Sequence, residues 1–247
     1  MNRIPSRVRW KLLLRSFLVQ GSWNYETLIG TGFAFTLVPF LRFLHPNDPA
    51  ARRAALRRHS GIFNSHPYLA TVAVGAVARM EADGADPAMM ERFKSAMRGS
   101  LGSLGDRLIW SAWRPASALL GIVILLAGAP WWLAVLAFLT VYNALHLALR
   151  FWGLRAGIEN GIEVGKVLRA APFEAIVSWA GNAGAFLAGM AVMLAMVPMR
   201  EGITTSSLAA GLAAAVTGLG LGMRGRIVVA PTLGVAWILA IVWGLTN

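Results

Sequence analysis

Five long apolar runs in the second half of the chain most constrain its fold. They occupy Trp110–Ala127, Trp131–Leu149, Phe173–Val197, Leu208–Leu221 and Val228–Leu245. Several of them approach or exceed the ~18–20 residues that a helix needs to cross a bilayer. Charged residues make up only 14% of the chain and hydrophobic residues 57%, which is too apolar for an ordinary soluble domain. We therefore predict an all-α integral membrane protein in which residues 116–247 form a transmembrane half with about five helices.

The first half of the chain contains shorter and interrupted apolar segments. Leu28–Leu44 carries two glycines and Pro39, and Gly61–Ala78 is broken by polar residues and Pro67. Segments of this kind suit re-entrant hairpins, whose irregular backbone must be buried in protein or line a wet cavity. We therefore predict that residues 1–115 form a cytoplasm-facing half that contains re-entrant hairpins.

Three basic helices are expected in this half. Residues 1–19 place five basic side chains among apolar ones, which predicts an interfacial amphipathic helix; docking of an acidic soluble partner is the alternative. Two cytoplasmic helices should begin at Asp48-Pro49 and Asp86-Pro87, because aspartate is a good N-cap and proline suits the first helical position. The second of them should end at about Arg98. Residues 1–247 are interpreted as one membrane domain.

The distribution of positive charge predicts the topology. The net charge is +12, and basic residues concentrate in the first half, in loop 150–170 and at Arg224 and Arg226. The positive-inside rule explains this pattern better than nucleic-acid binding does, and it places the N-terminus and loop 150–170 in the cytoplasm and the C-terminus outside. We expect no removable signal peptide. The chain has no cysteine, so it can form neither a disulfide nor a thiolate metal site.

A polar and aromatic segment, Gln20-Gly21-Ser22-Trp23-Asn24-Tyr25-Glu26, precedes the first of the interrupted apolar segments. Amide, hydroxyl and carboxylate groups can bind sugar hydroxyls, and an aromatic ring can stack on the apolar face of a pyranose. We therefore predict a substrate-binding set that consists of Gln20, Ser22, Trp23, Asn24 and Glu26. The alternative is an interfacial Trp/Tyr belt with a helix cap.

Charged residues in or beside apolar segments are costly, so each needs a partner or a polar cavity. Asp106 and Arg114 are candidates for a gate or for an ion pair that only stabilises the fold, with Glu26 as another partner for Arg114. Glu174 begins an apolar run, where a carboxylate favours the positive end of a helix.

Neither a nucleotide site nor a metal site is expected. Glycines at 99, 102 and 105 resemble a phosphate cradle, but no Walker lysine follows and no strand precedes them. Close helix packing or an unwound turn is a better interpretation. The four histidines are His45, His59, His66 and His146, and none has a metal-ligand partner four residues further along a helix.

Several sequence blocks resemble the IID component of mannose/fructose/sorbose-family phosphotransferase systems. The blocks are QGSWNYE, Ala51–His59, Phe63-Asn64-Ser65-His66-Pro67, Gly99–Asp106, Trp110, Arg114-Pro115, and Asn143–Gly153 with Arg150. The resemblance runs unevenly over almost the whole chain. In this family the glycine-rich block ends in Gly-Asp-Pro, whereas here Arg107 stands in place of that proline and Ser100 in place of an earlier one.

The resemblance implies a sugar permease subunit of the bacterial cytoplasmic membrane. A IIC membrane subunit would share the sugar path, in a multimer of IIC–IID pairs, and phospho-IIB of a IIAB protein would dock on the cytoplasmic side. Phosphoryl transfer then belongs to IIA and IIB, so no catalytic residue and no cofactor are expected here. The expected docking residues are those of the basic helix, namely Arg52, Arg53, Arg57 and Arg58. A regulatory or scaffold protein that has lost transport, and a stand-alone transporter, remain alternatives.

Overall fold

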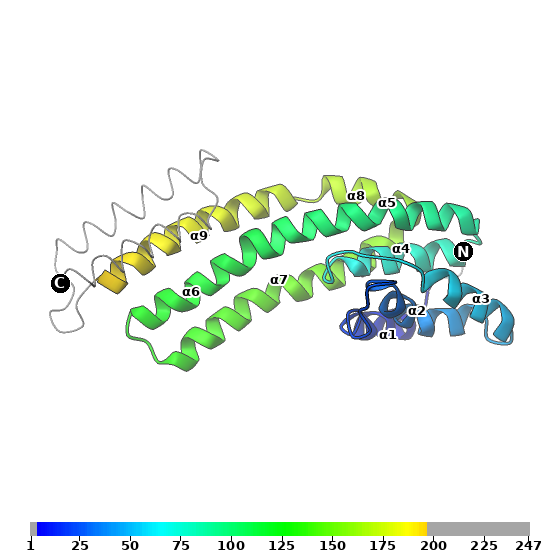
Figure 1. Cartoon of the computed structure of the whole chain (residues 1–247), viewed down its shortest axis with the longest axis horizontal. Helices are drawn as coiled ribbons and strands as arrows, with labels where there is room; N and C mark the ends of the chain where they lie inside the picture. The colour runs from blue at the N-terminus through cyan, green and yellow to red at the C-terminus, as the bar shows by residue number, and fades with distance from the viewer. Residues whose placement is uncertain (1–3, 197–247) are drawn as a thin grey trace. The chain divides into compact units, whose positions relative to one another are not determined.

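The computed structural model describes residues 4–196, and every regular element in that part of the chain is helical (Figure 1). In chain order the elements are α1 Ser6–Ser16, α2 Gly30–Leu44, α3 Pro49–His59, α4 Ala70–Ala82, α5 Pro87–Gly105, the π-helix η1 Asp106–Trp113, α6 Arg114–Leu126, α7 Trp131–Asn160, the 3-10 helix η2 Gly161–Glu163, α8 Val164–Ala170 and α9 Phe173–Met196. The predicted all-α class is confirmed.

Three helical stretches among the described residues are long and apolar enough to cross a membrane. They are Pro87–Leu126, Trp131–Ala170 and Phe173–Ala195. These stretches cover the first three of the five predicted spans up to Leu126, Leu149 and Ala195. The other two, Leu208–Leu221 and Val228–Leu245, lie outside the described residues.

The described residues fall into two compact units. Residues 4–106 and 145–171 form the first, and residues 107–144 and 172–196 form the second. The interpretation of the chain as one membrane domain with halves at 1–115 and 116–247 stays a prediction.

The predicted starts of the two basic helices at Asp48-Pro49 and Asp86-Pro87 are both confirmed. The Asp48 carboxylate accepts a hydrogen bond from the backbone N–H of Ala51 at 2.8 Å, and Asp86 caps α5 through the N–H of Met89 at 3.1 Å. Each cap satisfies a backbone donor that has no partner within its own helix.

The predicted end of the second helix at about Arg98 was wrong. Helix α5 continues through the glycine-rich block to Gly105, and η1 follows it without a break. Ser100 donates back to the carbonyl of Ala96 at 3.2 Å, so the serines of the block are satisfied inside the helix. The π-helical register ends just before Pro115, whose missing N–H and ring would disturb a regular α-helix.

The predicted basic loop 150–170 is not a loop in the structure. Helix α7 continues to Asn160, and η2 and α8 follow it. Packing overrides the polar composition here, because the backbones of α4 and α7 approach closely at three glycines. A Cβ on Gly157 would lie 2.3 Å from the carbonyl oxygen of Val72, and one on Gly75 would lie 2.4 Å from that of Leu154. A Cβ on Gly153, one turn before Gly157, would lie 2.7 Å from the Thr71 hydroxyl and 3.3 Å from the Val72 nitrogen, as small residues four apart permit.

Helix α4 is the centre of the first unit. All its residues from 70 to 78 are buried. The interrupted apolar segment Gly61–Ala78, which predicted a hairpin, therefore ends in a core helix. The other interrupted segment, Leu28–Leu44, contains α2, an unbroken helix that includes Pro39. Re-entry of either segment into a membrane stays a prediction.

The second unit is held together mainly by the packing of α6 against α9. The rings of Trp113 and Trp179 lie 6.0 Å apart, and the Trp113 indole N–H donates to the carbonyl of Val141 at 3.1 Å. Arg107, which stands where the family resemblance led us to expect a proline, forms an ion pair with Glu174 at the start of α9. The arginine thus provides a link within this unit that a proline could not provide.

Candidate functional site

The predicted substrate-binding residues lie in one non-helical loop between α1 and α2, residues 20–28, which we call the Asn24 loop. Its organising side chain is Asn24. The amide oxygen accepts from the backbone N–H groups of Glu26 and Thr27 at 3.0 and 2.8 Å, and the amide nitrogen donates to the Ser22 carbonyl at 3.1 Å. These bonds form an Asx turn, in which a short amide replaces backbone partners. Asn24 therefore fixes the shape of the loop.

The loop is also tied to the segment before α4. Leu28 adopts a left-handed conformation with φ of 58°, which is uncommon for a leucine. The N–H of Ile29 donates to the carbonyl of Phe63 at 3.0 Å, and the N–H of Phe63 donates to the carbonyl of Thr27 at 3.1 Å. A Cβ on Gly30 would lie 2.0 Å from the Gly61 carbonyl oxygen, so the two chains are in close contact. The C-terminal end of the Asn24 loop is therefore fixed by backbone contacts with residues 61–63.

The remaining side chains of the predicted set are exposed. Gln20, Ser22 and Glu26 reach the surface, and Trp23 is 46% exposed. The Trp23 ring meets Tyr25 edge to face at 4.8 Å, and Ser22 hydrogen-bonds to Thr31 at 2.8 Å. The structure brings the five residues together on one loop, whereas the assignment of the loop to a sugar stays a prediction.

Replacing Asn24 by alanine tests that assignment. The loss of the Asx turn should cost about 1–3 kcal/mol, which is roughly a five- to hundred-fold loss of sugar affinity if the loop binds substrate. Sugar binding to the purified membrane complex is the measurement, together with hydrogen exchange of residues 22–28. Asn47→Ala is the matched control, because Asn47 is exposed, lies outside the predicted set and has a side chain that makes no hydrogen bond within the described part of the chain. If Asn24→Ala and Glu26→Ala both leave affinity unchanged in a folded protein, the loop is only structural.

The four arginines of the basic helix α3 divide into two pairs. Arg53 and Arg57 are exposed, which leaves them accessible to a partner. Arg52 donates to the carbonyl of His45 at 3.3 Å, and Arg58 forms a 2.7 Å ion pair with Glu81 of α4. The expected docking set therefore contains two accessible members and two that also stabilise the fold.

Arg58 belongs to a buried network that joins α3, α4 and α5. The same Glu81 oxygen lies 2.7 Å from Nε2 of His59, whose side chain is fully buried. The Lys94 ammonium donates to the Arg58 carbonyl at 3.0 Å and to Glu91 at 2.9 Å. Burial lowers the pKa of His59 despite the nearby carboxylate. Burial would raise the pKa of Glu81, but its bonds to His59 and Arg58 lower it overall.

These shifts predict acid lability. Burial also lowers the pKa of His66 to about 4, and the charge of Arg150 acts in the same direction. Below about pH 6.5 the unfolded chain binds protons that these two buried histidines do not accept. Stability should therefore fall as pH drops from about 6.5, by up to about 1.4 kcal/mol per pH unit for each histidine, and the depressed pKa of Glu81 adds a loss at still lower pH.

Thermal unfolding in detergent at about pH 7 and about pH 5 measures this effect. His66→Asn should flatten the dependence, because asparagine does not titrate and can still accept the Tyr68 N–H bond that Nδ1 of His66 accepts at 3.3 Å. His45→Asn controls for the substitution itself, because in the part of the chain that the structure describes the His45 side chain makes no hydrogen bond or ion pair with His59, Glu81 or His66. An equal acid-induced loss of stability in the wild type and in His66→Asn would show that His66 does not contribute.

Sequence reasoning missed a second cluster, which surrounds Arg150 of α7 and which we call the Arg150 cluster. The guanidinium donates to the Ser16 carbonyl at 2.6 Å and hydroxyl at 3.0 Å, and to Nε2 of His146 at 2.7 Å. Its carbon lies 4.6 Å from the centre of the Phe17 ring and 5.4 Å from that of Tyr68. Tyr68 in turn stacks on His146 at 3.8 Å.

Arg150 is unusual because it is 3% exposed and no carboxylate among the described residues lies within ion-pair distance. Its charge is stabilised instead by a helix C-terminal carbonyl and by aromatic faces. The cluster therefore attaches the end of the basic helix α1 to α7. The spacing of His146 and Arg150, four apart in an apolar run, was the sequence signal for a shared polar face.

The predicted ion pair of Asp106 or Glu26 with Arg114 stays a prediction, because both carboxylates belong to the first unit and Arg114 to the second. Asp106 and Arg114 are both exposed, and the Arg114 guanidinium lies 5.1 Å from the centre of the Trp110 ring. Within the second unit, Arg107 forms an ion pair with Glu174. A gating role for Asp106 or Arg114 stays a prediction.

Comparison with known proteins identifies the family of this chain. Residues 3–210 match the family described as PTS system mannose/fructose/sorbose family IID component. The mannose-specific EIID component of Escherichia coli K12 is 34% identical over 186 residues, which are 73% of this chain and 65% of that protein. The sorbose-specific EIID component of Klebsiella pneumoniae is 32% identical, over 73% of this chain and 67% of that protein. The match thus spans slightly less than two thirds of the Escherichia coli relative.

Solved structures agree with the sequence comparison. A chain in the complex of the mannose transporter ManYZ with microcin E492 matches 100% of this chain and 98% of its own length, with a TM-score of 0.61 and 26% identity. A second structure, described as a membrane protein, matches with a TM-score of 0.69 and 26% identity, over 99% of this chain and 96% of its own. The resemblance that the QGSWN, basic-helix and FN-x-x-P blocks indicated is confirmed. The chain belongs to the IID components of the mannose/fructose/sorbose family of phosphotransferase systems.

Proposed function

We propose that this chain is a permease subunit of a phosphoenolpyruvate-dependent sugar phosphotransferase system, and that it translocates a hexose-type sugar together with a IIC subunit. The family match over residues 3–210 carries this proposal. The membrane-length helices and the mannose and sorbose relatives support it. The sugar itself is left open, because hydroxyl stereochemistry is read by a geometry that the Asn24 loop alone does not define.

Phosphoryl transfer is assigned to the IIA and IIB partners. Two histidines of this chain, His59 and His66, are buried, and their rings take part in internal contacts with Glu81 and Tyr68. A phosphoryl acceptor must be open to its donor, so neither residue suits that role. Arg53 and Arg57 are exposed cations on one short helix, and we assign them to docking of phospho-IIB.

The orientation follows from the same assignment. Helix α3 must be cytoplasmic for phospho-IIB to reach it, so we assign the first compact unit to the inner face of the bacterial cytoplasmic membrane. With five spans, the C-terminus then lies outside. A reporter fused to the C-terminus that is active only in the cytoplasm would contradict this orientation. The expected assembly is a multimer of IIC–IID pairs.

A transport assay in cells tests the proposal. A strain without a mannose-family permease should take up and phosphorylate sugar when it expresses this chain with its IIC and IIAB partners, and it should fail when this chain is omitted. The double variant Arg53→Gln/Arg57→Gln should reduce phosphorylation and retain co-purification with IIC. Co-purification with IIC without any sugar uptake would favour the regulatory or scaffold alternative, and uptake without IIC would favour a stand-alone transporter.

A further inference from the structure

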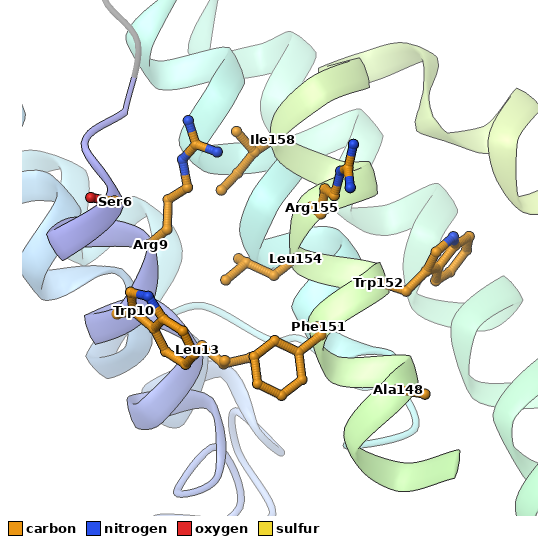
Figure 2. Close-up of a pocket in the computed structure, with 10 residues that line it drawn as sticks. All are labelled: Ser6, Arg9, Trp10, Leu13, Ala148, Phe151, Trp152, Leu154, Arg155 and Ile158. Atoms are coloured by element: carbon orange, nitrogen blue, oxygen red, sulfur yellow. The ribbon is translucent and has the colours of Figure 1, made fainter. Parts of the chain in front are cut away.

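A cavity of about 620 Å³ lies between α1 and the second half of α7, both within the first compact unit (Figure 2). Its size is within the range of about 300–1,000 Å³ that is typical of ligand pockets. Its lining residues are Ser6, Arg9, Trp10, Leu13, Ala148, Phe151, Trp152, Leu154, Arg155 and Ile158. None of these residues belongs to the Asn24 loop, the Arg150 cluster or the basic helix α3.

Most of the wall is apolar. The Trp10 and Phe151 rings meet edge to face at 5.6 Å and an interplanar angle of 82°, although both remain partly exposed. Leu13 and Leu154 are buried beneath them. Figure 2 shows the two rings together at one end of the cavity, with Leu154 between them and the other end. An open, aromatic and aliphatic surface of this kind favours a hydrocarbon chain.

The other end of the cavity carries two guanidinium groups. Figure 2 shows the head groups of Arg9 and Arg155 on the two sides of Ile158. Each is oriented through its Nε: Arg9 donates to the Ile4 carbonyl at 2.8 Å, and Arg155 donates to Glu159 at 2.8 Å. The terminal nitrogens of both arginines make no hydrogen bond within the part of the chain that the structure describes. Glu159 offsets part of the charge, but it is half exposed and screened by water.

We propose that this cavity binds an anionic phospholipid, with the phosphate between Arg9 and Arg155 and an acyl chain against Trp10 and Phe151. Two oriented guanidinium groups fit a phosphate because they offer paired N–H donors. The apolar wall fits the chain of the same molecule, and the protein lies in a bilayer that supplies it. A sugar would meet few hydrogen-bond acceptors here, since Glu159 is already engaged by Arg155.

Lipid binding would fix α1 against α7 at its first turns, as the Arg150 cluster does at its last residue. The two ends of one basic helix would then be attached by different means, one by protein contacts and one by lipid. This inference concerns a site separate from sugar transport, so it can fail while the proposed function holds.

Retention of lipid by the purified full chain tests the proposal. Phosphatidylglycerol and phosphatidylcholine with the same acyl chains are added in detergent, and bound lipid is counted by native mass spectrometry. The wild type should retain phosphatidylglycerol in preference to phosphatidylcholine. Arg9→Gln/Arg155→Gln should reduce that retention by about ten- to thirtyfold, because each arginine near an anionic headgroup raises the affinity for the lipid by roughly fivefold.

Two further variants keep the test decisive. Arg53→Gln/Arg57→Gln removes the same charge from α3 and should leave retention unchanged. Leu154→Trp places a larger side chain between the ring end and the arginine end of the cavity without a charge change, and it should abolish retention. Added inorganic phosphate should leave retention by the wild type unaffected, which separates a lipid from a free anion. Equal retention of the two lipids, or an equal loss in the α3 variant, would overturn the proposal. Displacement of the lipid by added IIC subunit would also overturn it, because the cavity would then be a subunit interface.

Discussion

Replacing Gly157 by alanine should destabilise the first compact unit by at least about 2 kcal/mol, because the new Cβ overpacks a backbone contact. It would lie 2.3 Å from the Val72 carbonyl oxygen and 2.6 Å from the Ala76 nitrogen. Neither atom belongs to a flexible side chain, so α4 and α7 would have to separate. A shift of that kind would reach the buried core helix α4 and the parts of the unit that pack on it.

The same substitution at Gly102 is the matched control. Gly102 is also helical, but a Cβ there would meet no described atom within 4 Å, so alanine should stabilise α5 by up to about 1 kcal/mol through its helix propensity. Unfolding of both variants in detergent, followed by circular dichroism or by denaturant titration, gives the comparison. Similar stability changes of one sign in the two variants would contradict the packing of α4 against α7.

Replacing Arg150 by lysine should release the end of α1 and cost about 3 kcal/mol, because a lysine cannot reproduce three guanidinium hydrogen bonds and two aromatic contacts. The Ser16 carbonyl and hydroxyl and the His146 ring would lose the donors they now have at 2.6, 3.0 and 2.7 Å. The positive charge is retained, so a change in stability would report geometry and not net charge. Arg169→Lys, on α8 of the same unit and exposed, is the control.

The chain has no cysteine, so a single cysteine can report this release directly. A cysteine at Leu13, whose side chain is buried on α1, should react slowly with a thiol reagent in the wild-type background. Its reaction should be faster in the Arg150→Lys background and unchanged in the Arg169→Lys background. Equal labelling rates in all three backgrounds would show that Arg150 does not hold α1 in place.

Local signals in the sequence predicted a large part of the fold. Asp48-Pro49 and Asp86-Pro87 begin helices because a cap and a proline act on the residues next to them, whatever the tertiary structure is. The apolar runs predicted the membrane class for a similar reason, since each crossing needs a certain length of apolar chain. Both signals depend on neighbours in sequence.

Contacts between distant segments explain where these predictions were wrong. Residues 150–170 look like a basic loop, but Gly153 and Gly157 bring α7 against α4, and Arg150 finds its partners on α1. The two glycines four apart are a local signal for close helix packing, which we did not use. The partners of Arg150 on α1 cannot be read from residues 150–170 alone. The predicted end of the second basic helix at about Arg98 was also wrong. Ser100 of the glycine-rich block bonds back to its own helix, so small polar residues that often end a helix continue one here.

The candidate site was predicted in its residues but not in its internal bonding. The segment before the interrupted apolar run does leave the helix and does expose Trp23 and Glu26. The role of Asn24 as the centre of an Asx turn depends on Thr27, which the sequence reasoning did not consider, and on the attachment of the loop to Phe63. Such contacts decide which polar atoms of the loop remain available to a ligand, and they can be known only from the three-dimensional structure.

Sugar phosphorylation by purified components tests the central claim most directly. Proteoliposomes that contain this chain and its IIC subunit receive phosphoenolpyruvate, the two general phosphotransferase proteins and IIAB on the outside, with labelled sugar sealed inside and the cytoplasmic face outward. We predict that sugar phosphate appears outside, that omission of this chain abolishes it, and that omission of phosphoenolpyruvate does so too. Equal production of sugar phosphate by vesicles that contain IIC but lack this chain would contradict its role as a permease subunit.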